Sequence, residues 1–165
     1  MQKIGEGIPR PYNPLIEKGN LLMIPKHDED FYGWAMANAT LLKQRKYQEA
    51  DMDKIIEELE EMGISNKHAL ISRLAQLVFH LLKWQYQPDF RGRSWEGSIE
   101  GQREEIGLLL QDSPSLKSKI DECFPVAYKK SKSLIKQETP IDLKLLPTEC
   151  PYTLDQIMDD QFYPD

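Results

Sequence analysis

Arg73 and His80 are the two side chains whose types and spacing point most directly to chemistry. They are seven residues apart, so in a helix they stand almost in line on one face. An imidazole exchanges a proton near neutral pH, and a guanidinium binds phosphate in a bidentate manner. Together they form a minimal set for metal-free cleavage of RNA through its 2′-hydroxyl. The alternative is a histidine at the border of a core, hydrogen-bonded to a neighbouring helix.

The run from Arg73 to His80 resembles a motif of the HEPN superfamily of helical-bundle ribonucleases and nucleotide-binding domains. In that motif an arginine is followed by four to six residues and then a histidine, and six residues lie between the two here. Leu74 departs from the motif, because a polar residue usually follows the arginine. The resemblance implies a metal-independent ribonuclease or a nucleotide-binding bundle in which Arg73 and His80 are the catalytic candidates.

A turn rich in aromatic and basic residues follows, from Lys83 to Trp95. Such a surface is typical of base stacking and phosphate binding, and it is equally typical of a packed helical corner anchored by Trp and Tyr. In a helical hairpin centred near residue 90, His80 faces the neighbourhood of Gln102, so the two sets form one polar site under the nucleic-acid interpretation. The candidate binding residues are Lys83, Trp84, Arg93, Trp95, Gln102 and Arg103.

An acidic run offers a third, weaker candidate. Glu57 and Glu61 are four residues apart, and His68 lies seven beyond Glu61, so a helix places all three on one side where carboxylates and imidazole bind metals. The alternative is a solvated acidic face near a helix N-terminus, where negative charge is favourable. Because the chain contains no Glu-x-x-His motif, we predict neither a metal nor a cofactor.

The elements that position these residues are predicted to be helices. Apolar residues recur at three- and four-residue steps after a proline- and glycine-rich start, and no alternating run indicates a convincing strand. We therefore predict an irregular N-terminal arm over residues 1–27 and a single all-α bundle over residues 28–165. Its helices are expected over 28–46 with a cap at Asp28, over 51–87, over 95–111 with a cap at Ser94, from Pro114 through Pro125, and from Leu154 after a Thr153/Gln156 capping box.

The second of these helices is expected to be the centre of the bundle. Between Leu70 and Trp84 its apolar residues occupy well over half of the helical circumference, which requires several neighbours. The remaining polar arc consists of Ser72, Arg73, Gln76, His80 and Lys83.

Composition excludes some classes of protein. The 165 residues carry 21 Lys and Arg against 27 Asp and Glu, and the net charge of −6 argues against binding to polyanions or anionic membranes. No segment is predicted to be a leader or a membrane span, so a cytoplasmic location is expected. Cys123 lies on an apolar helical stripe and is expected to be a core residue and not a nucleophile. Neither Cys123 nor Cys150 has the spacing of a Cys-x-x-Cys motif or a zinc site.

Several motifs in order resemble the bacterial family called domain of unknown function 29, from about residue 28 to residue 164. The resemblance implies an all-helical single-domain protein, and it assigns no activity or cofactor. The motifs are Asp30-Phe31-Tyr32-Gly33-Trp34-Ala35, the run from Ile55 to Gly63, the run from His80 to Pro88, Arg93-Ser94-Trp95, Gln102-Arg103, Ser113-Pro114-Ser115-Leu116 and Cys150-Pro151-Tyr152-Thr153-Leu154.

The leading functional prediction is a non-enzymatic interaction or regulatory domain that binds a protein partner or itself. The chain has no phosphate loop, no nucleophile with its base and no metal-ligand set in its sequence. Its charges are separated: residues 49–61 hold seven acids against Lys54 alone, and residues 117–136 hold six lysines against two acids. Separated charges favour a specific protein partner.

Overall fold

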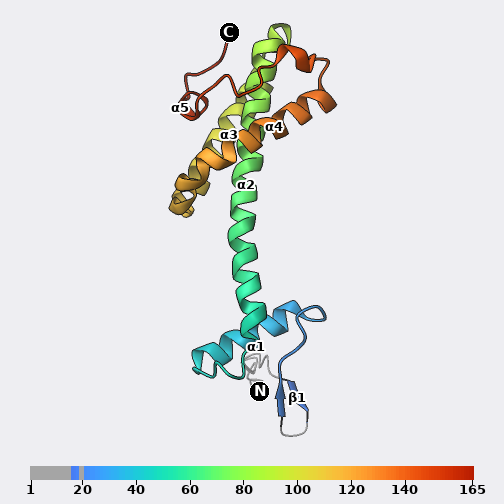
Figure 1. Ribbon diagram of the computed structural model, residues 1–165, viewed down its shortest axis with the longest axis vertical. Coiled ribbons are helices and arrows are strands. Elements are labelled where there is room, and N and C mark those ends of the chain that lie inside the picture. The colour runs from blue at the N-terminus through green and yellow to red at the C-terminus, as the bar shows by residue number, and fades with distance from the viewer. Residues whose placement is uncertain (1–15, 19–20) are drawn as a thin grey trace, which may run out of the picture. The chain divides into compact units, whose positions relative to one another are not determined.

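The computed structural model describes residues 16–18 and 21–165 (Figure 1). The chain divides into two compact units, Met1–Leu59 and Glu60–Asp165, and each is described by itself. The long helix α2, Met52–Tyr86, begins in the first unit and continues into the second. The prediction of one domain over residues 28–165 stays a prediction.

The described residues of the first unit form an antiparallel pair of short strands and one complete helix. Strand β1 (Ile16–Lys18) pairs antiparallel with β2 (Leu21–Met23), and α1 (Phe31–Lys43) follows. The prediction of an arm without regular structure is therefore wrong at these two strands. Three-residue strands are too short to show an alternating pattern. The rest of the predicted arm up to residue 15 lies outside the described residues.

Helix α1 starts at a different cap from the predicted one. Its N-cap is Asp30, whose carboxylate accepts a hydrogen bond of 2.8 Å from the backbone N–H of Gly33, and Asp28 lies outside the helix. Gly33 is needed at this place because a Cβ there would collide with the Asp30 carboxylate. The helix buries Trp34, Ala37, Asn38 and Leu41, whereas Phe31, predicted on the buried face, is more than half exposed.

Helix α2 confirms the predicted long second helix and runs without interruption through Gly63. From Leu70 onward it is surrounded on most of its circumference, as the broad apolar arc predicted. Its buried residues are Leu70, Leu74, Ala75, Leu77, Val78, Phe79, Leu81 and Leu82.

The second unit is a helical bundle in which α3 and α4 pack against the C-terminal half of α2 (Figure 1). The all-α bundle with four main helices and a short last helix is confirmed. The elements after α2 are η1 (Pro88–Phe90), α3 (Arg93–Asp112), η2 (Pro114–Lys119), α4 (Ile120–Glu138), η3 (Leu143–Leu145) and α5 (Leu154–Met158).

The sequence predicted some helix ends correctly and others incorrectly. The Thr153/Gln156 capping box of α5 is present with both of its hydrogen bonds. The predicted cap at Ser94 is wrong, since α3 begins at Arg93 behind the cap residue Gly92, two residues earlier than predicted. Pro114 opens a 3₁₀ turn instead of α4, and α4 then continues through Pro125. These ends matter here because α3 carries Gln102, Arg103 and Glu105, and the backbone of α5 accepts a hydrogen bond from Arg103.

Candidate functional site

His80 lies half-buried on α2, and its environment favours the neutral imidazole. Burial, with a smaller contribution from the charge of Lys83, lowers the pKa of His80 to about 4. Its Nδ1 atom is buried without a hydrogen-bond partner, and the Oε1 atom of Gln102 on α3 is in the same condition. Both atoms retain unused hydrogen-bonding capacity at this border of the core.

Of the polar candidates on α2 and α3, Arg73 and Gln102 line the same cavity, whereas His80 and Arg103 are not part of its lining. Arg73 and Gln102 line a shallow cavity of about 270 Å³ with Ala69, Ser72 and Gln76. The Arg73 guanidinium is 2.9 Å from the Glu105 carboxylate, so a residue of α3 already engages its charge. His80 and Arg103 are not among the residues that line this cavity, so the cavity does not unite the four candidates Arg73, His80, Gln102 and Arg103.

Arg103 is instead a buried arginine that fastens the C-terminal segment. Its guanidinium donates hydrogen bonds to the carbonyls of Ile157 at 2.8 Å, Asp160 at 3.3 Å and Phe162 at 2.6 Å. It also lies over the Tyr163 ring, 5.4 Å from the centroid. Because its donors point at backbone carbonyls, Arg103 holds the end of the chain against α3.

The aromatic and basic residues around the α2–α3 turn form a packed corner. The Lys83 ammonium lies 4.3 Å from the centroid of the Trp95 ring, and burial lowers the pKa of Lys83. The Trp84 ring packs against Tyr163 with centroids 4.8 Å apart. Arg93, the first residue of α3, is exposed. Three of the six binding candidates, Lys83, Trp84 and Trp95, are thus engaged with neighbours inside the second unit.

No metal centre is formed among the residues that the structure describes: no three His, Cys, Asp or Glu side chains there are grouped to hold an ion. Of the three candidates, Glu57 pairs with Lys54 at 2.9 Å, and Glu61 and His68 are exposed. Both cysteines are free, and burial raises the pKa of each thiol. Over the same described residues, no helix combines the length and apolar character needed to cross a membrane.

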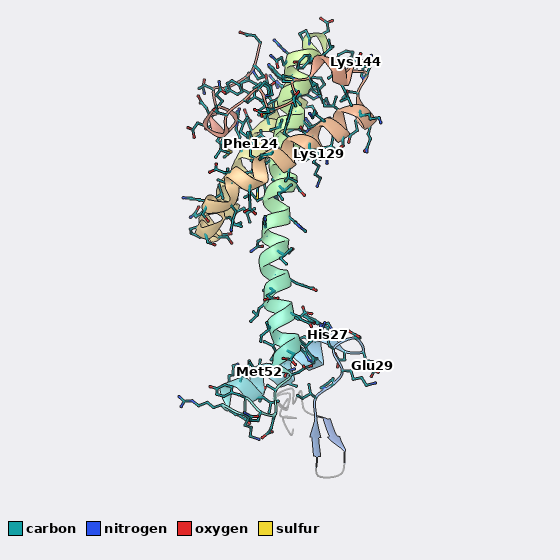
Figure 2. The ribbon with its side chains drawn as sticks, viewed as in Figure 1. His27, Glu29, Met52, Phe124, Lys129 and Lys144 are labelled. Atoms are coloured by element: carbon teal, nitrogen blue, oxygen red, sulfur yellow. The ribbon has the colours of Figure 1, made fainter. Side chains whose placement is uncertain are left out.

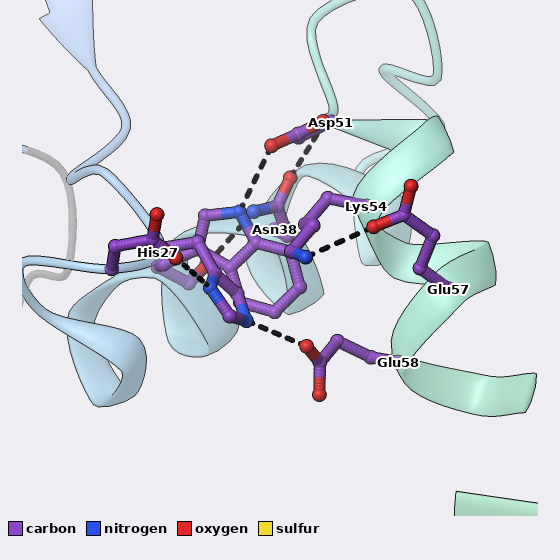
Figure 3. A network of polar contacts seen from close by, with 8 residues as sticks. His27, Asn38, Asp51, Lys54, Glu57 and Glu58 are labelled. Carbon is purple, nitrogen blue, oxygen red and sulfur yellow. Dashed lines mark hydrogen bonds and ion pairs between the residues drawn. The ribbon is translucent and has the colours of Figure 1, made fainter. Parts of the chain in front are cut away.

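In the first unit, His27 links the segment before α1 to the start of α2 (Figure 3). Its Nδ1 atom is 2.8 Å from the Asp28 carboxylate, and its Nε2 atom is 2.6 Å from the Glu58 carboxylate. The hydrogen bond to Asp28 makes the largest contribution to the raised pKa of His27, and the hydrogen bond and negative charge of Glu58 raise it as well. Burial and the positive charge of Lys54 act in the other direction and lower this pKa. An imidazole between two carboxylates is favoured in its charged, doubly donating form.

A second polar chain in the first unit fixes the entrance to α2 (Figure 3). The buried Asn38 donates to the carbonyl of Trp34 at 2.9 Å and accepts from the backbone N–H of Asp51 at 2.8 Å. The Trp34 indole donates to the Asp51 carboxylate at 3.2 Å. Sequence reasoning missed Asn38 and His27 because it placed the first on an apolar stripe and the second in the arm.

The first two turns of α2 carry three exposed apolar side chains: Met52, Ile56 and Leu59 are 38%, 48% and 62% exposed (Met52 is marked in Figure 2). At four- and three-residue spacing they lie within an arc of about 60° around the helix axis. We call these three residues the apolar face. Sequence reasoning recorded only the acids of this run, although the same spacing rule would have revealed the face.

Comparison with known proteins places the chain in a family. No curated protein and no solved structure matches it. The family model described as "Domain of unknown function DUF29" matches residues 27–163, so the first matched residue is His27 and the match includes both α1 and the whole bundle. Since this match spans most of the 165 residues, the chain belongs to the DUF29 family.

Proposed function

We propose that this protein is a non-enzymatic interaction module that binds a protein partner through the apolar face of α2. The observation that carries the proposal is the exposure of Met52, Ile56 and Leu59 on one side of a helix. Single exposed apolar residues are ordinary on protein surfaces, but an aligned set on one helix face is the pattern of an interaction site.

The immediate surroundings of the apolar face support this proposal. Two hydrogen bonds tie the start of α2 to the rest of the first unit: His27, in the segment before α1, bonds to Glu58, and Asn38 of α1 bonds to Asp51. A face on an ordered scaffold loses little conformational entropy when a partner binds, so more of the contact energy contributes to affinity.

The chemistry of the second unit gives less support to the ribonuclease alternative. Arg73 is paired with Glu105, and Arg103 is committed to backbone carbonyls. Lys83, whose charge acts on His80, lies over the Trp95 ring. With these three cations engaged, a neutral His80 lacks the phosphate-binding partner that phosphoester cleavage needs.

We further infer that the module works in the bacterial cytoplasm. The support is the free state of Cys123 and Cys150, which fits a reducing compartment, and the resemblance of the motifs to a bacterial family.

Photocrosslinking in cells tests the proposed function. A photoreactive amino acid at position 59 should give a discrete protein adduct. The matched control is position 145, because Leu145 is also 62% exposed but lies in η3. Adducts from neither position, or equal adducts from both, would overturn the proposal, and so would RNA cleavage that His80→Ala abolishes.

A further inference from the structure

We infer that the partner of the apolar face is a basic amphipathic helix. This inference rests on the proposed function and adds the chemistry of the partner to it.

The width of the face fits a single helix. Met52, Ile56 and Leu59 are at positions i, i+4 and i+7, which is the spacing of a seam between two packed helices. A stripe of about 60° matches the contact that one partner helix makes, and it is narrower than the arc that a helix inside a bundle presents. One complementary stripe of apolar side chains on a partner helix covers it.

The negative charges beside the apolar face indicate that the partner is positively charged. Within the seven acids of residues 49–61, the only base is Lys54, and it already pairs with Glu57. Asp53 and Glu57 lie on the same side of α2, about 90° and 130° from the centre of the face by helical geometry. Both are exposed, and the Glu57 side chain remains 60% exposed although it pairs with Lys54. Lys or Arg side chains flanking an apolar stripe reach such carboxylates, and this complementarity raises both the association rate and the specificity.

The same charges disfavour two other occupants. If two copies of this chain paired through the face, each acidic run would lie beside the other, and like charges at an interface oppose association. An anionic lipid surface is repelled as well, since helices that lie on such membranes carry Lys and Arg on their polar side. A basic partner helix removes both conflicts.

Binding of a basic partner helix also leaves the hydrogen bond between His27 and Glu58 intact. Glu58 is on the other side of the face from Asp53, and its carboxylate is half-buried and already bonded to His27. The carboxylates that remain accessible to a partner are therefore those on the Asp53 side, which predicts which acids control binding.

Fluorescence anisotropy with labelled synthetic peptides tests the inference on the full-length protein. The probe is an 18-residue amphipathic helix with leucines at i, i+4, i+7 and i+11 and lysines elsewhere on its flanks. Its controls replace the lysines by glutamate or by glutamine. We expect saturable binding of the lysine peptide, at least tenfold weaker binding of both control peptides, and weakening on raising salt from 50 to 500 mM.

Matched variants of the protein locate the binding. Leu59→Gln should weaken binding at least tenfold, whereas Leu145→Gln, at an equally exposed site, should change it less than twofold. Ile56→Gln and Leu108→Gln form a second pair, because both native side chains are 48% exposed. Asp53→Asn with Glu57→Gln should reduce both the affinity and its salt dependence. Thermal unfolding of each variant checks that the fold is retained.

Each contrary outcome has a distinct meaning. Equal binding of the lysine, glutamate and glutamine peptides overturns the basic partner, as does binding that Leu59→Gln leaves unchanged. A protein that sediments as a dimer and becomes a monomer on Leu59→Gln shows that a second copy covers the face. If position 59 gives a crosslinked adduct in cells but no basic peptide binds, this inference fails and the proposed function stands; if neither occurs, both fail.

Discussion

The two halves of α2 differ in how far their apolar side chains are exposed. Leu74 and Leu81 in the C-terminal half are fully buried, whereas Ile56 and Leu59 in the first turns are about half exposed or more. The C-terminal half has an apolar arc broad enough for several neighbours, and helices of the second unit supply them. In the first turns, the exposed apolar side chains form one narrow stripe. The width of an apolar stripe therefore separates residues that hold this fold together from residues that are available to a partner.

The sharpest test of this difference is one truncation made at two places in α2. Leu74→Ala removes a fully buried side chain and should lower the free energy of unfolding by about 3 kcal/mol. Leu59→Ala should change it by less than about 0.5 kcal/mol, because its side chain is mostly exposed already. Urea unfolding measures both. Similar losses at the two positions would show that the start of α2 is packed in solution, and the distinction would fail.

A second test breaks the fastening of the C-terminal segment. Arg103→Met should cost about 2 kcal/mol, because three carbonyls lose a charged donor inside the second unit. Hydrogen exchange should become faster over residues 157–163. Arg93→Met, at the exposed first residue of α3, is the matched control and should have no such effect. Unchanged exchange in Arg103→Met would mean that this arginine does not hold the segment.

The two histidines with shifted pKa values, His80 and His27, should respond to pH in opposite directions. The pKa of His80 is lowered from 6.5 to about 4, so between pH 7 and pH 4 the unfolded chain takes up a proton that the folded protein does not. Stability should fall with falling pH over this range. After allowance for partial exposure of the ring, the loss should be about 1 to 2 kcal/mol. Urea unfolding at several pH values should show a smaller loss in His80→Gln; His68→Gln, at an exposed site of α2, is the control. An unchanged pH dependence in His80→Gln would contradict the burial of this ring.

The smallest expected effect is at His27. Its pKa is raised by Asp28 and Glu58, so its contribution to stability is fully present below pH 6.5 and is lost as the pH rises through the raised pKa. Glu58→Gln should move the His27 pKa downward, and nuclear magnetic resonance of the imidazole measures the pKa directly. A pKa below 6.5 in the native protein would show that the linkage to Glu58 does not form.

Much of the second unit was predictable from the sequence because its signals are strong and local. The apolar arc of α2 and the Thr153/Gln156 capping box each depend on residues close in the chain, and both are present. The candidate site residues were harder to place from the sequence. Arg73 and Gln102 do share a cavity, but the position of Arg103 is decided by carbonyls more than 50 residues away, which no spacing rule contains.

The first unit was harder to predict because its decisive contacts join separate segments. Asn38 has the spacing of an apolar stripe, and its role becomes visible only when its partner Asp51 is known. His27 shows the same limit, since its bond to Glu58 spans 31 residues. The hairpin β1–β2 is too short for periodicity to reveal. Polar side chains with distant partners are the ones that sequence patterns assign least well.

The central claim is that a partner protein covers the apolar face in the cell. The direct measurement is the alkylation rate of a cysteine placed at position 59, in a Cys150→Ser background, compared with a cysteine at position 145. We predict fast labelling of both positions in the purified protein, and in cells slow labelling at 59 with fast labelling at 145. Equally fast labelling of position 59 in cells and in the purified protein would contradict the account.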